Sequence, residues 1–110
     1  MQSATGALAV FITASNHDEA RRIANTLVEE KLTACVQVLP QMESVYRWQG
    51  AIERQSEILL IAKTTTGSFD ELEKRVRELH SYDTPEIVAV PIVAGSDAYL
   101  EWLSANSCGR

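Results

Sequence analysis

The chain has few cysteines, no long hydrophobic run and a deficit of positive charge. Its two cysteines, Cys35 and Cys108, lack the short spacing of metal-binding pairs, and we expect no disulfide between them in a reducing compartment. No apolar run approaches the roughly 18 residues of a membrane-spanning helix. The first six residues lack the basic segment that opens a signal peptide, so the sequence predicts a cytoplasmic protein with no membrane partner.

The charge balance and the missing motifs narrow the function further. The sequence has 10 Lys and Arg residues against 15 Asp and Glu residues, which gives a net charge of −5. This balance argues against nucleic acid and anionic membranes as partners. The sequence also lacks a glycine-rich phosphate loop, a nucleophile elbow and a Cys-His nucleophile signature. We therefore predict a protein that is not an enzyme.

The most informative feature that is present is a pair of long β-type runs, 33–48 and 51–64, joined by Gln49-Gly50. Fourteen extended residues span roughly 45 Å, whereas a compact domain of this length is only about 35 Å across. Part of this hairpin must therefore extend beyond the core. Its tip carries Tyr46 and Trp48, which could stack on a ligand but are more typical of anchors in a protein interface.

The remaining segments complete a regular alternation of strands and helices. We expect strands at 8–13 and 86–93, helices over 17–31 and 68–80, and a short last helix that is capped by 95–97 and contains 99–103. The order β-α-β-β-α-β-α predicts an α+β fold, a ferredoxin-like sandwich with a protruding hairpin. Residues 1–110 would form one domain, with mobile tails at 1–6 and 105–110. Two helices cover only one face of such a sheet, so we expect packing between subunits to cover the other.

Local signals refine these elements. Asn16 followed by Glu19 and Ser68 followed by Glu71 have the spacing of a capping box, which predicts where the first two helices begin. Pro40 interrupts the first hairpin arm and cannot donate a ladder hydrogen bond, which predicts a bulge or an edge position. The first helix presents an apolar face built from five residues: Ala20, Ile23, Ala24, Leu27 and Val28.

Five motifs in order resemble the CutA divalent-cation-tolerance family. They are Glu-Lys-Leu-Thr-Ala-Cys-Val-Gln at 30–37, Ser44-x-Tyr46-x-Trp48-x-Gly50, Glu57 through Lys63-Thr64, His80-x-Tyr82-x-x-Pro85-Glu86-Ile87, and Tyr99-Leu-x-Trp102. The resemblance implies a ferredoxin-like fold and a tight homotrimer built through the hairpin, similar in architecture to PII-type signalling proteins. It also implies a role in the response to divalent metals such as copper.

Copper binding in that family involves a Cys near the end of the first strand and a His at the end of the second helix. Here the strand end is Ile12-Thr13-Ala14, without Cys, while His80 stands at the helix end. We therefore expect weak copper or zinc binding dominated by His80, to which Asp83 and Glu86 could add oxygen ligands. The alternative is an imidazole that only packs the loop or caps the helix. Cys35 could be a soft copper ligand, but its apolar neighbours favour a buried structural thiol.

A second candidate site involves Lys63, which ends the apolar run 58–62. It could be a surface lysine whose stem packs on apolar residues. In a cleft between subunits it could instead bind a small anion, with Glu57, Tyr82 and Glu86 lining the same pocket. Two functions therefore remain open: a trimeric binding or signalling protein that takes a metal ion or small anion, and a structural or adaptor trimer that presents surfaces to other proteins.

Overall fold

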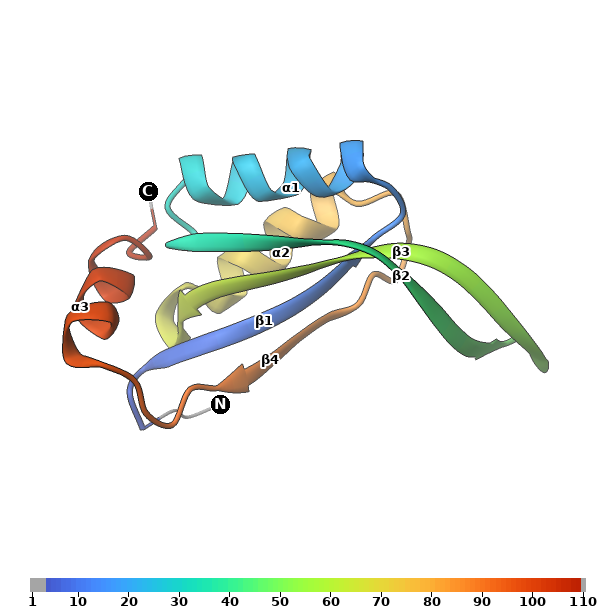
Figure 1. The fold of residues 1–110 in the computed structure, drawn as a ribbon. Helices are drawn as coiled ribbons and strands as arrows, with labels where there is room; N and C mark the ends of the chain where they lie inside the picture. The colour runs from blue at the N-terminus through green and yellow to red at the C-terminus, as the bar shows by residue number, and fades with distance from the viewer. Residues whose placement is uncertain (1–3, 110) are drawn as a thin grey trace.

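The computed structural model describes residues 4–109 as four strands, three α-helices and one short 3-10 turn (Figure 1). In chain order these are β1 Ala7–Ala14, α1 His17–Glu29, β2 Cys35–Trp48, β3 Ala51–Thr65, η1 Thr66–Ser68, α2 Phe69–Leu79, β4 Ile87–Pro91 and α3 Asp97–Ala105. The predicted order of elements is confirmed. Within the described residues no helix is long and apolar enough to cross a membrane.

The four strands form one sheet in the order β2-β3-β1-β4, and every neighbouring pair is antiparallel. The register places Val10 opposite Ala62 and Ala89, which fixes β1 and β3 as the central strands. This order is that of a ferredoxin-like sandwich, as predicted. Helices α1 and α2 lie side by side on one face of the sheet, and α3 lies at the end of the molecule opposite to the hairpin tip (Figure 1).

The core fills the space between that sheet face and the two helices. Alternate strand residues face the helices, and they pack against the apolar stripes of α1 and α2. The fully buried members of this cluster include Leu8, Val10, Ile12, Ile23, Leu27, Leu60, Ala62, Leu72 and Val76. Four of the five residues expected on the apolar face of α1 are buried. Val28 is the exception at 44% exposed, because it lies at the edge of the stripe.

The hairpin extends beyond the core, as its length required. The described chain measures 44 × 25 × 23 Å, and the tip of β2 and β3 forms the far end of the long axis (Figure 1). Gln49 and Gly50 turn the chain with positive φ values of 50° and 82°, the geometry of a tight hairpin turn. The β2–β3 register shifts between Leu39 and Met42, so Pro40 lies in the predicted bulge on an edge strand.

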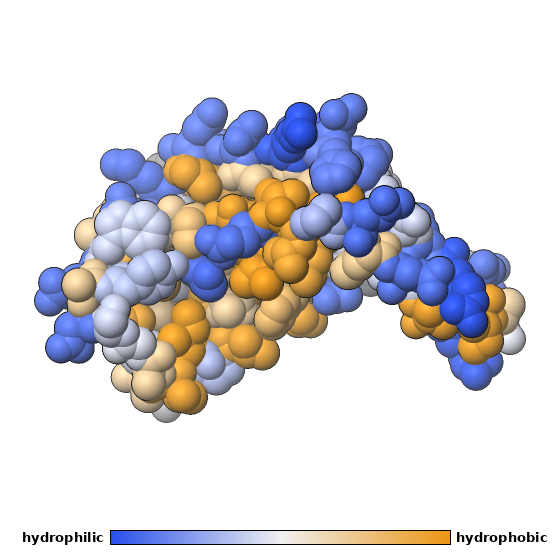
Figure 2. Space-filling model, viewed as in Figure 1, coloured by the Kyte–Doolittle hydropathy of each residue, from blue (hydrophilic) through white to orange (hydrophobic). Residues whose placement is uncertain are grey.

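The second face of the sheet is not covered by α1 or α2, and α3 contacts it only near Cys35, through Tyr99. Strand residues of the opposite parity lie there, and the apolar ones are Ala9, Phe11, Leu39, Leu59, Ile61, Val88 and Val90. Val88 is 51% exposed and Val90 is 44% exposed. Hydrophobic side chains gather over the sheet and again at the hairpin tip in Figure 2. An apolar sheet face open to water is typical of a surface that packs against another chain.

The two capping predictions had different outcomes. Asn16 Oδ1 accepts a hydrogen bond from the Glu19 N–H at 2.8 Å, which confirms the start of α1. Ser68 is the N-cap residue of α2, which confirms the predicted start, but its side chain makes no capping hydrogen bond, so the capping box itself was wrong. Its hydroxyl instead donates to the carbonyl of Ser107, a partner 39 residues away in the sequence.

The segment after α3 is tied to the body of the domain. Ser107 is fully buried, and its hydroxyl donates to the Leu103 carbonyl at 2.8 Å. The Gly109 N–H donates to the Lys31 carbonyl at 2.9 Å. These contacts attach residues 107–109 to the body of the domain, and the mobility expected of residues 1–6 and 105–110 stays a prediction. At the other end, Thr5 donates to the Ile92 carbonyl, while residues 1–3 and 110 lie outside the described residues.

Candidate ligand cavity

A cavity of about 620 Å³ lies where the hairpin leaves the body of the domain. Strands β1, β2 and β3 supply part of its lining, and the loop between α2 and β4 supplies the rest. The lining residues are Thr13, Ser44, Val45, Tyr46, Trp48, Gln55, Glu57, Tyr82, Asp83, Thr84 and Glu86. Its size is within the usual range for pockets that hold small molecules.

A chain of hydrogen bonds crosses this cavity from the hairpin to the loop. The Tyr46 hydroxyl donates to Gln55 Oε1 at 2.8 Å, and Gln55 Nε2 donates to the Tyr82 hydroxyl at 3.1 Å. The Tyr82 hydroxyl in turn donates to Glu57 Oε2 at 3.1 Å. Burial, and then the negative charge of Glu57, raise the pKa of Tyr82 to about 12. Tyr82 therefore remains a neutral donor to the Glu57 carboxylate at physiological pH.

The charges around this cavity have one sign. Glu57, Asp83 and Glu86 line it, and none of the described lining residues is Lys, Arg or His. Glu57 is 7% exposed, whereas Asp83 and Glu86 are exposed at the rim. No three His, Cys, Asp or Glu residues in the part of the chain that the structure describes are placed to hold a metal ion together. The described lining of the cavity is therefore negatively charged.

His80, the predicted metal ligand, is buried behind the cavity with both ring nitrogens engaged. Its Nδ1 accepts a hydrogen bond from the Tyr82 N–H at 3.0 Å, which assigns the ring proton to Nε2. Nε2 then donates to the Thr13 carbonyl at 2.6 Å. The His80 and Tyr82 rings lie 4.8 Å apart between centroids. This geometry supports the alternative of a loop-packing imidazole, because a metal would have to displace one of these bonds.

Glu19 holds the same loop from the other side, a role that its capping position did not reveal. The Glu19 carboxylate accepts hydrogen bonds from the Ser15 N–H at 2.8 Å and the Ser81 N–H at 2.7 Å. Burial alone would raise the pKa of Glu19, but the hydrogen bonds from Ser15 and Ser81 outweigh it and lower the pKa to about 2. An ionised Glu19 thus joins the start of α1 to the loop that carries Tyr82.

Lys63 lies elsewhere in the single chain. It is six residues from Glu57 along β3, a separation of roughly 20 Å in an extended strand. Its ammonium donates to Gln37 Oε1 at 2.7 Å on the open face of the sheet. One chain therefore brings Glu57, Tyr82 and Glu86 to one cavity but does not bring Lys63 there. A pocket that contains Lys63 would require a neighbouring chain, as the prediction of a shared cleft supposed.

Cys35 is also on the open face, directly opposite Lys63 in the β2–β3 register. It is partly exposed, so the expectation of a buried thiol was wrong for the single chain. Its Sγ lies 3.5 Å from the Tyr99 hydroxyl of α3 and accepts a hydrogen bond from Gln37 Nε2 at 3.5 Å. The apolar neighbours that suggested burial are Ala34 and Val36, which belong to the opposite face of the strand.

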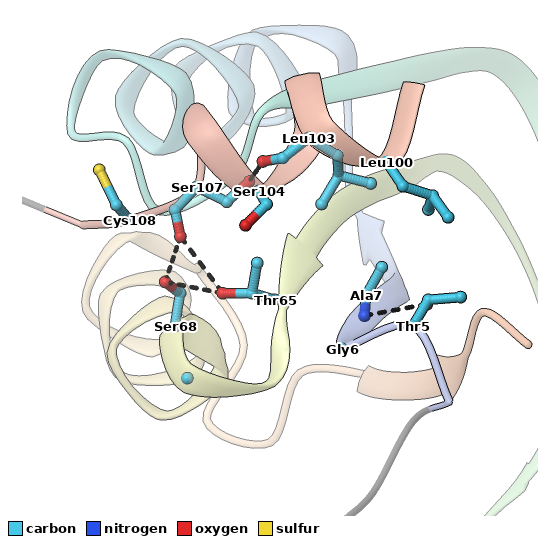
Figure 3. Close-up of a pocket in the computed structure, with 11 residues that line it drawn as sticks. Thr5, Gly6, Ala7, Thr65, Ser68, Leu100, Leu103, Ser104, Ser107 and Cys108 are labelled. Carbon is cyan, nitrogen blue, oxygen red and sulfur yellow. Dashed lines mark hydrogen bonds between the residues drawn. The ribbon is translucent and has the colours of Figure 1, made fainter. Parts of the chain in front are cut away.

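A smaller cavity of about 380 Å³ lies at the other end of the sheet, between α3 and the start of α2 (Figure 3). Hydroxyl groups point toward one another there. The Ser68 hydroxyl donates to the Ser107 carbonyl, and the single Thr65 hydroxyl proton is shared between that carbonyl at 3.3 Å and the Ser68 hydroxyl at 3.2 Å (Figure 3). These hydrogen bonds attach the C-terminal segment to the end of β3 and the start of α2.

The fold and the cavity together define a class: a ferredoxin-like domain with an overhanging hairpin, an open apolar sheet face and an acidic cavity at the hairpin base. A family model described as CutA1 divalent ion tolerance protein matches residues 8–106. The chain therefore belongs to the CutA1 divalent ion tolerance family, which confirms the resemblance found in its motifs.

Individual relatives agree with this assignment. A divalent-cation tolerance protein CutA of Thermus thermophilus is 50% identical over 98 residues, which cover 89% of this chain and 95% of that protein. A chloroplastic CutA protein of Arabidopsis thaliana is 45% identical, and the match covers 91% of this chain but 55% of that longer protein. The solved structure of a Cut A1 protein from Thermus thermophilus has a TM-score of 0.91 at 48% identity and covers 92% of this chain and 98% of that chain.

Proposed function

We propose that this protein is a non-enzymatic homotrimer that binds small cations, copper or another divalent metal ion among them, at clefts between its subunits. The observation that carries the ligand class is the cavity at the hairpin base, whose described lining contains three carboxylates and no basic side chain. Relatives of the chain are named for divalent-cation tolerance. A cation would be attracted to this cavity and an anion repelled from it.

Assembly is supported by the two exposed apolar surfaces on the same chain. The open face of the sheet carries Val88 and Val90, and the hairpin tip carries Val45, Trp48 and Ile52, all more than two-fifths exposed. Covering both surfaces would remove large apolar side chains from water, which is the main driving force of protein association. Three-fold assembly is our choice because the family resemblance implies a trimer; the surfaces alone would also permit a dimer.

A metal ion would need donors from more than one chain, since one described chain offers no set of three. Glu57, Asp83 and Glu86 would supply hard oxygen ligands at the cleft. His80 would contribute only by giving up its bond to Tyr82, so we expect any copper or zinc affinity to be micromolar or weaker. A small anion bound through Lys63 is the less favoured ligand, because Lys63 lies outside the acidic cavity of its own chain.

The adaptor function remains a second candidate on one observation, the exposed apolar hairpin tip. In that case a different protein, and not a second copy of this chain, would cover the tip. The cytoplasmic location expected from the sequence also remains a prediction.

Sedimentation equilibrium and calorimetry test this proposal together. We expect a mass near that of three 12.2 kDa chains at micromolar concentration. Titration with Cu²⁺, Zn²⁺ and citrate should give heat for the metals and none for citrate. Glu57→Gln should weaken metal binding, whereas Glu43→Gln, a matched change on the other face of the hairpin, should not. A monomer, or metal affinity equal in wild type and Glu57→Gln, would contradict the proposal.

A further inference from the structure

We propose that His80 acts as a pH-sensitive latch, which closes the loop between α2 and β4 while its ring is neutral and releases that loop when the ring gains a proton. This inference goes beyond the proposed function, because it needs neither a ligand nor a second subunit. The His80 side chain is 0% exposed in a single chain, so its surroundings are those of the folded domain itself. One contact of the ring requires the neutral form, and two features around it favour the charged form.

The contact that requires the neutral ring is the hydrogen bond from the backbone of Tyr82. The Tyr82 N–H lies 3.0 Å from His80 Nδ1, and an amide N–H can only donate. The other ring nitrogen, Nε2, donates its proton to the uncharged Thr13 carbonyl of β1 at 2.6 Å. A second proton would have to go to Nδ1, where it would face the Tyr82 N–H in a buried space. Two donors cannot bond to each other, so the ring cannot become charged while the loop keeps this conformation.

Two other features favour the charged ring. Glu19 of α1 places its Oε1 3.9 Å from His80 Nε2, and its carboxylate is ionised at neutral pH. His80 is also the C-cap residue of α2, where its backbone N–H donates to the Val76 carbonyl at 2.9 Å. The C-terminal end of a helix attracts positive charge. A protonated ring would therefore stay beside Glu19 and give up the bond to Tyr82.

The other charged groups of the neighbouring elements reach the ring less directly. Arg22 of α1 donates to the last carbonyl of α2 at 3.4 Å, and its charge opposes that of a protonated ring. Glu57 of β3 meets the loop through the Tyr82 hydroxyl. Asp83 and Glu86 follow His80 in the chain and line the cavity at the hairpin base. The three carboxylates favour the charged ring, as Glu19 does.

Release of the loop would alter the hairpin base, because the loop carries Tyr82. The Tyr82 hydroxyl joins Gln55 and Glu57 on β3. The open loop can take up a proton at His80 that the closed loop cannot, so acid shifts the equilibrium toward the open form. A freely exposed histidine has a pKa of about 6.5. Acidification from pH 7.5 to pH 5 should therefore raise the open fraction by about thirtyfold.

Hydrogen exchange of the full-length protein, at a fixed protomer concentration, tests the latch. The observable is the protection factor of the Tyr82 amide, which corrects for the intrinsic effect of pH on exchange. This factor should fall at least about tenfold between pH 7.5 and pH 5. The Leu32 amide, which donates to the Leu27 carbonyl outside this loop, should change less than about threefold. Equal protection of Tyr82 at the two pH values, or an equal fall at both amides, would overturn the proposal.

Two variants identify the group that titrates. The sequence contains two histidines, His17 and His80. His80→Gln retains an acceptor and a donor but gains no proton in this pH range, so the fall in Tyr82 protection should shrink to less than about threefold. His17→Gln, the matched change at an exposed histidine at the start of α1, should leave the fall unchanged. A fall that persists in His80→Gln would assign the effect to another group and refute the latch.

A measurement on the unmodified chain covers the case in which His80→Gln does not fold. The nitrogen chemical shifts of the imidazole report the charge of the His80 ring. The ring should become charged over the pH range in which the Tyr82 amide loses protection. A ring that is charged while Tyr82 stays protected, or neutral while Tyr82 exchanges freely, would contradict the proposal. These outcomes do not depend on metal binding, so the latch and the proposed function can fail separately.

Discussion

Replacement of Glu19 by Gln should lower the free energy of unfolding at neutral pH. In acid the difference between the variant and the wild type should become much smaller. The hydrogen bonds from Ser15 and Ser81 lower the pKa of Glu19 to about 2 from 4.5. A depressed pKa stabilises the folded state above pH 4.5, and that contribution is lost as the pH falls through 2. The shift corresponds to about 3 kcal/mol at pH 7. Gln keeps the shape but turns an N–H group toward donors that need an acceptor.

Urea unfolding at pH 7 and at pH 2.5 to 3 measures this effect. The protomer concentration is kept fixed because assembly alters the apparent stability. Asp18→Asn is the matched control: it removes a carboxylate from the same first turn of α1, but Asp18 is exposed and its loss should cost less than about 1 kcal/mol. If Glu19→Gln costs no more than Asp18→Asn at pH 7, or costs the same at both pH values, the structural role assigned to Glu19 is wrong.

Three further predictions concern the hairpin and the loop. Trp48→Ala should weaken trimerisation by about 2–4 kcal/mol while leaving the circular dichroism of the chain unchanged, and unchanged dissociation would show that Trp48 lies outside the interface. His80→Ala should lower the free energy of unfolding by about 3 kcal/mol and change copper affinity less than twofold, because its ring nitrogens serve the loop; loss of copper binding would restore His80 as a ligand. Because burial and Glu57 raise the pKa of Tyr82 to about 12, its contribution to stability is complete below pH 10 and lost as the pH rises toward 12. Tyr82→Phe should flatten the decline in stability over that range, and an unaltered decline would contradict the raised pKa.

The fold could be predicted from the sequence because its signals are local and agree with one another. The alternation in the strands, the apolar stripes of α1 and α2, and the Gln49-Gly50 turn all point to the same order of elements. The extension of the hairpin beyond the core could be predicted from the length of its two strands, which exceeds the diameter of a compact domain of this size. The errors occurred where a residue has a distant partner: Ser68 has a capping spacing, but the Ser107 carbonyl takes its hydroxyl.

The candidate site could be predicted only in part. The structure brings the loop of Tyr82 and Glu86 and the strand residue Glu57 to one cavity, as the motifs suggested, and their role as a ligand site stays a prediction. The role of Glu19 was missed because its partner Ser81 is 62 residues away in the sequence. The spacing of residues within a helix or strand does not predict such a contact. The hydrogen bonds of the two His80 ring nitrogens could not be predicted either. Both partners are backbone groups, which every residue supplies whatever its side chain.

The alternation of β3 connects assembly to ligand binding. Glu57 has the same parity as Leu59, Ile61 and Lys63, so the buried carboxylate of the cavity and the apolar open face lie on one side of the same strand. A chain that covers the open face would therefore meet the edge of the cavity, and it could bring its own Lys63 or carboxylates to the rim. Ligand binding and subunit association would then share contacts, so each must strengthen or weaken the other by the same free energy. A cation that binds the cavity of the trimer more tightly than that of the free chain should accordingly lower the concentration at which the trimer dissociates.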